Sequence, residues 1–189
     1  MVFYDLDGTL STLNSTFDFI EKYHQGKNNR LRLFFCKNVS RILNRTFMSG
    51  EMKRKILIMV YFAGVRVLNL EAFFDEVYRY DFEQSLTLLG QEVLKSQDDS
   101  KVLLTGCTSV PAKQIAELFG FKEVISTTLM LKWGRILGIS EDTYANKKMK
   151  FVKNCMEKYS LKKEDVIYYT DDQDGEKELA TLFGEIYYV

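Results

Sequence analysis

Two carboxylates near the start of the chain, Asp5 and Asp7, lie in the hexapeptide DLDGTL, directly after an apolar run at residues 1–4. The run predicts a strand, and Gly8 predicts a sharp turn after it. Acids at the carboxyl end of a strand in an α/β sheet lie where such sheets bind ligands. Like charges this close favour a divalent cation between them, which can hold phosphate as well. An ordinary Asp-Gly turn is the alternative.

Three later segments carry polar residues where strands are expected to end or a helix to begin. Thr105 and Gly106 follow a run of aliphatic residues and supply a hydroxyl and an open backbone amide for a phosphoryl oxygen. Asp171 and Asp172 follow another β-rich run, and Lys148 opens a predicted helix, where free amides favour an anion. Each segment alone is also compatible with a strand end, a helix cap or a solvated lysine. The presence of all these segments, in this order, favours a catalytic site over these ordinary explanations.

The elements that must position these residues alternate between strands and helices. Strands are predicted at residues 1–4, 101–105, 123–126, 165–170 and 185–189, and helices at 111–120, 148–159 and 176–183. This order predicts an α/β fold with a Rossmann-like parallel sheet. Trp133-Gly134 between apolar runs predicts a hairpin over residues 129–139.

A purely helical block interrupts this alternation. Apolar residues recur at helical spacing over residues 13–23, 29–43, 49–64 and 69–80, with Ser49 and Asn69 as candidate N-caps. We therefore expect an inserted helical cap domain at residues 13–97. The catalytic core is then formed by residues 1–12 and 98–189.

Composition excludes several classes of protein. The 189 residues carry zero formal net charge, which argues against a general nucleic-acid binder. Three cysteines without a CxxC pair predict neither a zinc site nor a disulfide framework, and favour a reducing compartment. No signal peptide is visible, and the longest apolar stretch, residues 56–65, is too short to cross a bilayer. We expect a cytoplasmic protein.

Charge is distributed unevenly within the helical block. Eleven lysines and arginines between Lys22 and Arg66 face a single acid, Glu51. Solvated helix faces are the ordinary explanation. The alternative is a basic surface that attracts an anionic substrate or makes peripheral contact with an anionic membrane, and residues 30–45 suit an interfacial amphipathic helix.

The chain resembles the haloacid dehalogenase (HAD) superfamily. Its four motifs are matched in order by DLDGT at residues 5–9, Thr105, Lys148 and Asp171-Asp172. Within it, the chain is most similar to the phosphoserine-phosphatase-like subgroup, which has a helical cap after the first motif. Residues 105–108, 115–121 and 124–127 resemble that subgroup around the second motif, and residues 49–53 and 62–64 resemble its cap helices.

Some positions depart from the subgroup's pattern. Thr105 and Asp172 stand where serine is usual, and Gly175 occupies the position of the second acid of the fourth motif. That acid is therefore Asp172, Asp174 or Glu176. Lys147 competes with Lys148 for the third motif, and the spacing to the following apolar residues favours Lys148. Phosphoserine itself is disfavoured as substrate, because Asn14 stands where the subgroup's phosphoserine phosphatases have a cap glutamate, and Gly106-Cys107 where they have paired glycines.

The resemblance implies a Mg²⁺-dependent phosphatase that acts on a small-molecule phosphomonoester through an aspartyl-phosphate. Asp5 would be the nucleophile and Asp7 the general acid and base. The phosphoryl oxygens would be held by Thr105, Gly106 and Lys148. The metal would be held by Asp5, the backbone carbonyl of Asp7, and Asp171, with Asp172 as a further metal residue that acts through water or in the second shell.

Three other functions fit parts of the same pattern. A phosphatase of phospholipid head groups, acting at a membrane surface, would use the same motifs and the basic cap. A receiver-like signalling protein also combines a phosphorylatable Asp with acids, a Thr and a Lys, but there the lysine comes last. A non-catalytic phosphate-binding protein of this fold is the third alternative.

Overall fold

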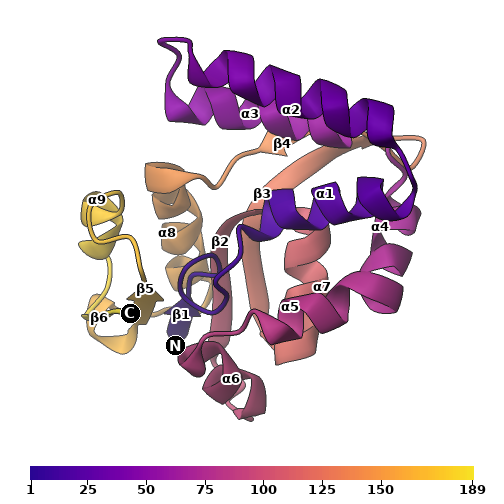
Figure 1. Ribbon diagram of the computed structural model, residues 1–189. Helices are drawn as coiled ribbons and strands as arrows, with labels where there is room; N and C mark the ends of the chain where they lie inside the picture. Colours follow the sequence, from indigo (N-terminus) through magenta and orange to yellow (C-terminus); the bar gives the residue numbers. More distant parts are fainter.

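The computed structural model describes all of residues 1–189, and its centre is a six-stranded sheet in the order β4–β3–β2–β1–β5–β6 (Figure 1). All neighbouring strands are parallel except β3 and β4, which form an antiparallel hairpin. The predicted Rossmann-like α/β sheet is therefore confirmed, and so is the hairpin. The strands are β1 (Val2–Tyr4), β2 (Lys101–Thr108), β3 (Glu123–Lys132), β4 (Arg135–Glu141), β5 (Ile167–Thr170) and β6 (Glu185–Tyr188).

Strand β1 occupies the middle of the sheet because it pairs with β2 on one side and β5 on the other. From β1 the sheet grows outward through β2 and β3 to β4, and the chain then crosses back to add β5 and β6 on the opposite side. Strand order thus reverses beside β1. Parallel α/β sheets bind ligands in the crevice that such a reversal opens at the carboxyl ends of the strands.

The two faces of the sheet are covered by different helices. In β2, Leu103 packs into one hydrophobic cluster with α7 (Ser109–Phe119). Its neighbours Val102 and Leu104 pack into a second cluster with α8 (Lys148–Lys158). Alternate side chains of a strand point to opposite faces, so α7 and α8 lie on opposite sides of the sheet. The short helix α9 (Lys177–Ala180) and the 3-10 turns η2 (Ala145–Lys147) and η3 (Lys163–Asp165) complete the core.

From residue 15 to residue 95, the segment between β1 and β2 is helical apart from short connections. They are α1 (Ser15–Gly26), α2 (Arg30–Asn44), α3 (Gly50–Phe62), α4 (Val67–Phe73), the π-helical turn η1 (Phe74–Tyr78), α5 (Arg79–Gln84) and α6 (Leu88–Lys95). Ser49 caps α3 as predicted, accepting a hydrogen bond from the Met52 amide. Asn69 does not cap the next helix, because α4 begins earlier and its N-cap is Arg66.

Helices α2 and α3 lie side by side as the outermost layer of the molecule, with the β3–β4 hairpin beneath them (Figure 1). Beneath this layer, a single hydrophobic cluster joins Phe62 of α3, Phe19 of α1 and Phe119 of α7. Packing is therefore continuous from the helical block into the core, and the division at residues 13 and 97 stays a prediction.

Candidate active site

The first two acids lie where β1 ends. The Asp5 amide still bonds the Tyr169 carbonyl of β5, and its Oδ1 accepts a hydrogen bond from the Leu6 amide at 2.8 Å. Asp7 Oδ1 accepts the Ser15 amide at the start of α1, at 2.9 Å, which ties the loop to that helix. Burial raises the pKa of Asp7 above its usual range, although the hydrogen bonds from Ser15 act against it. Asp7 therefore retains a proton more readily than an exposed aspartate.

A buried ion-pair trio joins Asp5, Lys148 and Glu176. Lys148 Nζ lies 2.8 Å from Asp5 Oδ2 and 2.5 Å from Glu176 Oε1. Burial raises the pKa of Asp5 to about 7, although Lys148 acts in the opposite direction. Burial also disfavours the charged form of Lys148, but its two carboxylate partners outweigh this and hold its pKa above the ordinary value. The site therefore keeps a permanent cation against the carboxylate of Asp5.

Glu176 is positioned by two further hydroxyls. Its Oε2 accepts hydrogen bonds from the Tyr168 hydroxyl at 2.7 Å and the Thr170 hydroxyl at 3.0 Å, both from β5. Both carboxylate oxygens of Glu176 thus have hydrogen-bond or ion-pair partners. Such partners offset the free energy that burial of a charge costs. Glu176 was one of three open choices for the second acid of the fourth motif. It is the one that contacts Lys148.

The other fourth-motif acids are exposed and lie differently. Asp171 Oδ1 is 3.4 Å from the Thr9 hydroxyl, and its carboxylate lies directly against the backbone of Gly8. A Cβ at Gly8 would fall 2.0 Å from Asp171 Oδ2, so only glycine allows this approach. Asp172 accepts the Gly175 amide at 2.7 Å and lines the cavity described below. Asp174 instead pairs with Lys177 at the surface.

Thr105 and Gly106 lie in β2, beside β1. Thr105 Oγ1 accepts the Cys107 amide at 3.0 Å, and the Thr105 carbonyl accepts the Thr143 hydroxyl at 2.7 Å. The Gly106 carbonyl accepts hydrogen bonds from Thr127 and from Arg54 of α3. This part of β2 is therefore anchored from two sides, and Thr105 and Gly106 line the cavity described next.

A cavity of about 520 Å³ lies between the sheet and the helical block. On the core side it is lined by Asp5, Asp7, Thr105, Gly106, Tyr144, Ala145, Lys148, Asp172, Gly175 and Glu176. On the helical side it is lined by Asn14, Thr16, Phe17, Asn44, Gly50, Lys53, Arg54 and Leu57. The strand ends thus form the floor and α1 and α3 the roof. A volume of this size fits a small metabolite.

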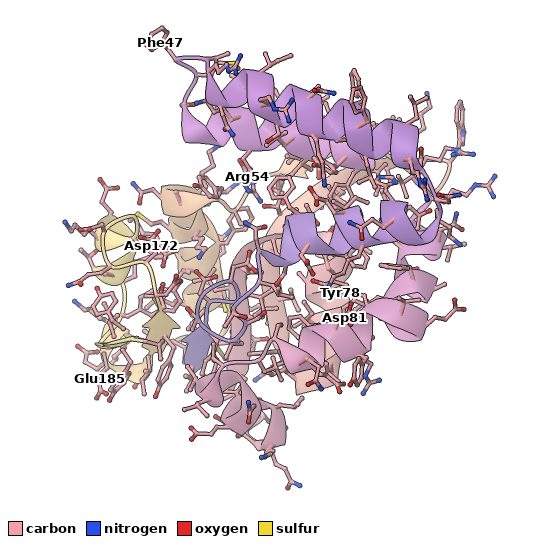
Figure 2. All side chains as sticks on the ribbon, viewed as in Figure 1. Phe47, Arg54, Tyr78, Asp81, Asp172 and Glu185 are labelled. Carbon is pink, nitrogen blue, oxygen red and sulfur yellow. The ribbon has the colours of Figure 1, made fainter.

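Arg54 connects roof and floor. Its guanidinium pairs with Asp142 at 3.0 Å and donates to the Thr127 hydroxyl as well as to the Gly106 carbonyl. Figure 2 shows Arg54 below α3, between that helix and the core, with Asp172 on the loop after β5. Sequence reasoning did not single out Arg54 or Lys53, because nothing in the helix pattern distinguishes them from solvated cations.

Lys147 does not enter the cavity. Its ammonium group pairs with Glu51 of α3 and lies 3.4 Å from Asp142, at a half-exposed position. Between the two candidate lysines of the third motif, only Lys148 contacts Asp5. The structure thus gathers Asp5, Asp7, Thr105, Gly106, Lys148 and Asp172 around one cavity. Asp171 is not among its lining residues, and its carboxylate lies against Gly8 instead.

The donor set at this end of β1 fits Mg²⁺. No three acids, histidines or cysteines converge to form a metal cage. The available donors are the carboxylates of Asp5 and Asp171 and the backbone carbonyl of Asp7, all hard oxygen atoms. Mg²⁺ is commonly held by one or two carboxylates while water fills its other positions, so two acids and a carbonyl are sufficient.

Acids that follow β1, a hydroxyl of β2 and the buried lysine that opens α8 thus line one cavity, which defines an α/β protein with a ligand site at one edge of its parallel sheet. The haloacid dehalogenase-like hydrolase family matches residues 2–174, and the chain belongs to this family. No curated protein sequence matches the chain. No helix is long and apolar enough to cross a membrane.

Solved structures share the fold at low sequence identity. A protein of unknown function from Bordetella pertussis Tohama I matches with a TM-score of 0.72 and 20% identity, over 98% of this chain and 87% of that one. A probable phosphoserine phosphatase from Vibrio cholerae matches with a TM-score of 0.68 and 11% identity, over 98% of this chain and 54% of that one. A phosphoserine phosphatase in its apo form matches with a TM-score of 0.64 and 14% identity, over 98% and 83%. These likenesses confirm a fold like that of phosphoserine phosphatases.

Proposed function

We propose that the protein is a Mg²⁺-dependent phosphatase that hydrolyses a small phosphomonoester through an aspartyl-phosphate on Asp5. The observation that carries this proposal is the contact between Asp5 and the buried Lys148 on the floor of the cavity. A carboxylate is a weak nucleophile toward an anionic phosphoryl group, so it needs a fixed positive charge beside it. Phosphoserine phosphatase structures share the fold, which supports the same reaction class.

In the first half of the reaction, Asp5 forms a bond to phosphorus as the bond from phosphorus to the substrate oxygen breaks. Asp7 donates its proton to the departing alcohol, a role that its raised pKa supports. Lys148, the Thr105 hydroxyl and the Gly106 backbone stabilise the phosphoryl oxygens. In the second half, water attacks phosphorus, Asp7 takes its proton, and Asp5 is released as carboxylate.

Mg²⁺, held by the carboxylates of Asp5 and Asp171 and the Asp7 carbonyl, would supply the charge that offsets the phosphoryl oxygens and keeps Asp5 ionised. Asp172 lines the cavity and would contact that ion through water. Glu176 is a positioning residue, because its ion pair with Lys148 holds that lysine in place. Residues 13–97 would act as a cap that excludes bulk water above the core of residues 1–12 and 98–189.

The test is release of phosphate from p-nitrophenyl phosphate with Mg²⁺ or with excess chelator. We expect turnover only with Mg²⁺, and Asp5→Asn to lower it by about 10⁴-fold or more. Asp75→Asn is the matched control, because it makes the same change at an exposed acid on η1. Equal turnover of the Asp5→Asn and unmodified proteins would refute the mechanism. Absence of turnover across a broad phosphomonoester panel would favour a non-catalytic phosphate-binding protein.

A further inference from the structure

The outer face of α2 carries two parallel rows of side chains that the rest of the molecule does not cover. One row is basic and has the spacing i, i+7, i+11, and the other is apolar and has the spacing i, i+4, i+11. At about 100° per residue, the members of each row lie within about 40° of one another around the helix, so each row runs roughly parallel to the axis. The basic row is Arg30, Lys37 and Arg41, and the apolar row, one residue further on, is Leu31, Phe35 and Ile42.

The apolar row is exposed to an unusual degree. Leu31 is 81%, Phe35 60% and Ile42 63% exposed, and Phe34 between the rows is also exposed. The opposite face of α2 is packed normally, since Cys36 and Leu43 are buried. Contiguous apolar side chains left in water on one face of a helix mark a surface that another phase or molecule covers.

The basic row has no acidic partner. Arg30, Lys37, Arg41 and the nearby Arg45 take part in none of the ion pairs of the molecule. The helix itself contains no acid. By contrast, Lys22 of α1 pairs with two carboxylates. The charge on α2 is therefore available to an anion from outside.

The surface continues to the mouth of the active-site cavity. Phe47, in the connection between α2 and α3, is fully exposed, and Figure 2 shows it at the far tip of the helix pair. Asn44 and Gly50, on either side of that connection, line the cavity. A partner that covers the outer face of α2 and Phe47 would therefore lie beside the entrance of the site.

We propose that the outer face of α2, together with Phe47, docks on an anionic lipid membrane. Anionic head groups complement Arg30, Lys37 and Arg41, and the interface between head groups and acyl chains accepts the apolar row. The helix would lie in the plane of the interface, as basic amphipathic helices do. Because no helix can cross a bilayer, the contact is peripheral.

Other occupants fit the two rows less well. A nucleic acid complements the cations but offers no apolar phase for Leu31 and Ile42. A second copy that packs α2 against α2 about a twofold axis places like charges opposite one another, with no acid on the helix to relieve them. A lipid surface satisfies both rows at once.

The experiment is co-sedimentation of the full chain with phosphatidylcholine vesicles, with and without about one-third phosphatidylglycerol. We expect binding to the anionic vesicles at low salt, and loss of most of it near 0.5 M salt, where the Debye length is about 4 Å. Neutral vesicles should bind far less. Binding that ignores lipid charge and salt, or no binding to anionic vesicles, overturns the proposal.

Matched variants locate the contact. Leu31→Asn should weaken vesicle binding about tenfold. Leu88→Asn is the control: Leu88 is also 80% exposed, but it lies on α6 at the opposite end of the molecule (Figure 1), so its substitution should leave binding unchanged. Lys37→Gln with Arg41→Gln should weaken it about 25-fold, at about fivefold per charge. Lys153→Gln with Lys163→Gln makes the same charge change on the core. Equal losses in the control and α2 variants would overturn the assignment to α2.

Two further readouts separate the alternatives. Dimerisation that Leu31→Asn abolishes, without vesicle binding, would assign the surface to self-association instead. Tighter binding to RNA than to anionic vesicles would assign it to nucleic acid. All four variants should hydrolyse p-nitrophenyl phosphate in solution as the unmodified protein does, since none alters the cavity. Failure of the docking proposal is thus distinguishable from failure of the proposed phosphatase activity.

Discussion

At the carboxyl end of β1 the charged groups are buried and paired, whereas on the outer face of α2 the cations are exposed and form no ion pair. Lys148 is enclosed by Asp5 and Glu176, and two hydroxyls complete the shell of Glu176. On α2, Lys37 and Arg41 stand in solvent beside exposed apolar side chains. Both regions concentrate charge, but only in the first are the charges paired with partners inside the protein.

The difference follows from the free energy of burial. Removing an ion from water costs several kcal/mol, so a buried charge persists only while its partners remain in place. An exposed cation loses little when it has no partner, and it gains when an anion arrives. Substitutions in the trio should therefore affect folding and activity together. Substitutions on α2 should affect only what binds from outside.

The largest effect on stability is expected from Lys148→Met. It leaves Asp5 and Glu176 facing each other without a cation, and we expect a loss of about 3–5 kcal/mol in the free energy of unfolding, together with loss of turnover. Lys147→Met, at the neighbouring half-exposed position, should cost less than about 1 kcal/mol. Urea denaturation of both variants makes the measurement. Similar losses of stability for the two variants would contradict the contrast between buried and exposed charges.

The next largest effect is expected from Glu176→Gln. The substitution removes the charge that balances Lys148 but keeps a side chain able to bond Tyr168 and Thr170, so we expect a loss of about 2 kcal/mol. Asp174→Asn, at the exposed pair with Lys177, should change stability by less than about 0.5 kcal/mol. The same urea titration compares them. If Asp174→Asn proved the more damaging, the positioning role of Glu176 would be wrong.

A smaller effect is expected from His24, the sole histidine, which lies buried beneath α2. Its Nε2 is 2.8 Å from the Tyr61 carbonyl oxygen, and burial lowers its pKa below the ordinary value. Below about pH 6.5, His24 is therefore protonated more readily in the unfolded chain than in the folded one. The free energy of unfolding should fall as the pH drops through this value. We expect His24→Gln to remove about 1 kcal/mol of this fall.

The measurement for His24 is the free energy of unfolding at neutral pH and near pH 5.5, for both proteins. Asp5 and Asp7 have raised pKa values and give the opposite slope, since the folded state there holds the extra protons. Their contribution is common to both proteins and cancels in the difference. An unchanged pH dependence after His24→Gln would show that the ring is not held neutral by burial.

The smallest effect on stability is expected on α2 itself. Phe35→Asn removes an apolar side chain that is mostly exposed, so the free energy of unfolding should change by less than about 0.5 kcal/mol. Leu43→Asn, on the buried face of the same helix, should cost about 3 kcal/mol. Thermal unfolding of the pair checks this. A large loss from Phe35→Asn would show that the outer face is packed in the folded protein.

The pattern of apolar residues was sufficient to predict the sheet. Buried parallel strands appear in a sequence as short apolar runs, and the helices between them appear as amphipathic segments. Helix α6 was not predicted, since its eight residues are too few to establish a period. The turn η1 was also missed. Apolar residues recur at roughly helical spacing throughout residues 69–80, so the sequence predicts one regular helix there and gives no sign of a change in hydrogen bonding.

The candidate site was predictable wherever a residue lies next to a strand end. Asp5 and Asp171 could be placed in this way because parallel strands end on the same edge of a sheet. Thr105 was expected at a strand end too, but β2 continues to Thr108. The choice between Asp172, Asp174 and Glu176 could not be made from spacing, since the loop after β5 decides which acid turns inward. Arg54 reaches the site from a distant helix, and no local pattern marks such a residue.

The central position of β1 bears on how the chain folds. Val2 pairs with Lys101 on one side and with Ile167 on the other, so the strand that carries the proposed nucleophile is synthesised long before either neighbour. Contacts of such high sequence separation make folding slow, and they leave an apolar strand open on both edges while the ribosome completes the chain. Asp5 meets its counter-charge Lys148 only after α8 emerges, so a nascent chain cannot assemble the proposed catalytic pair early.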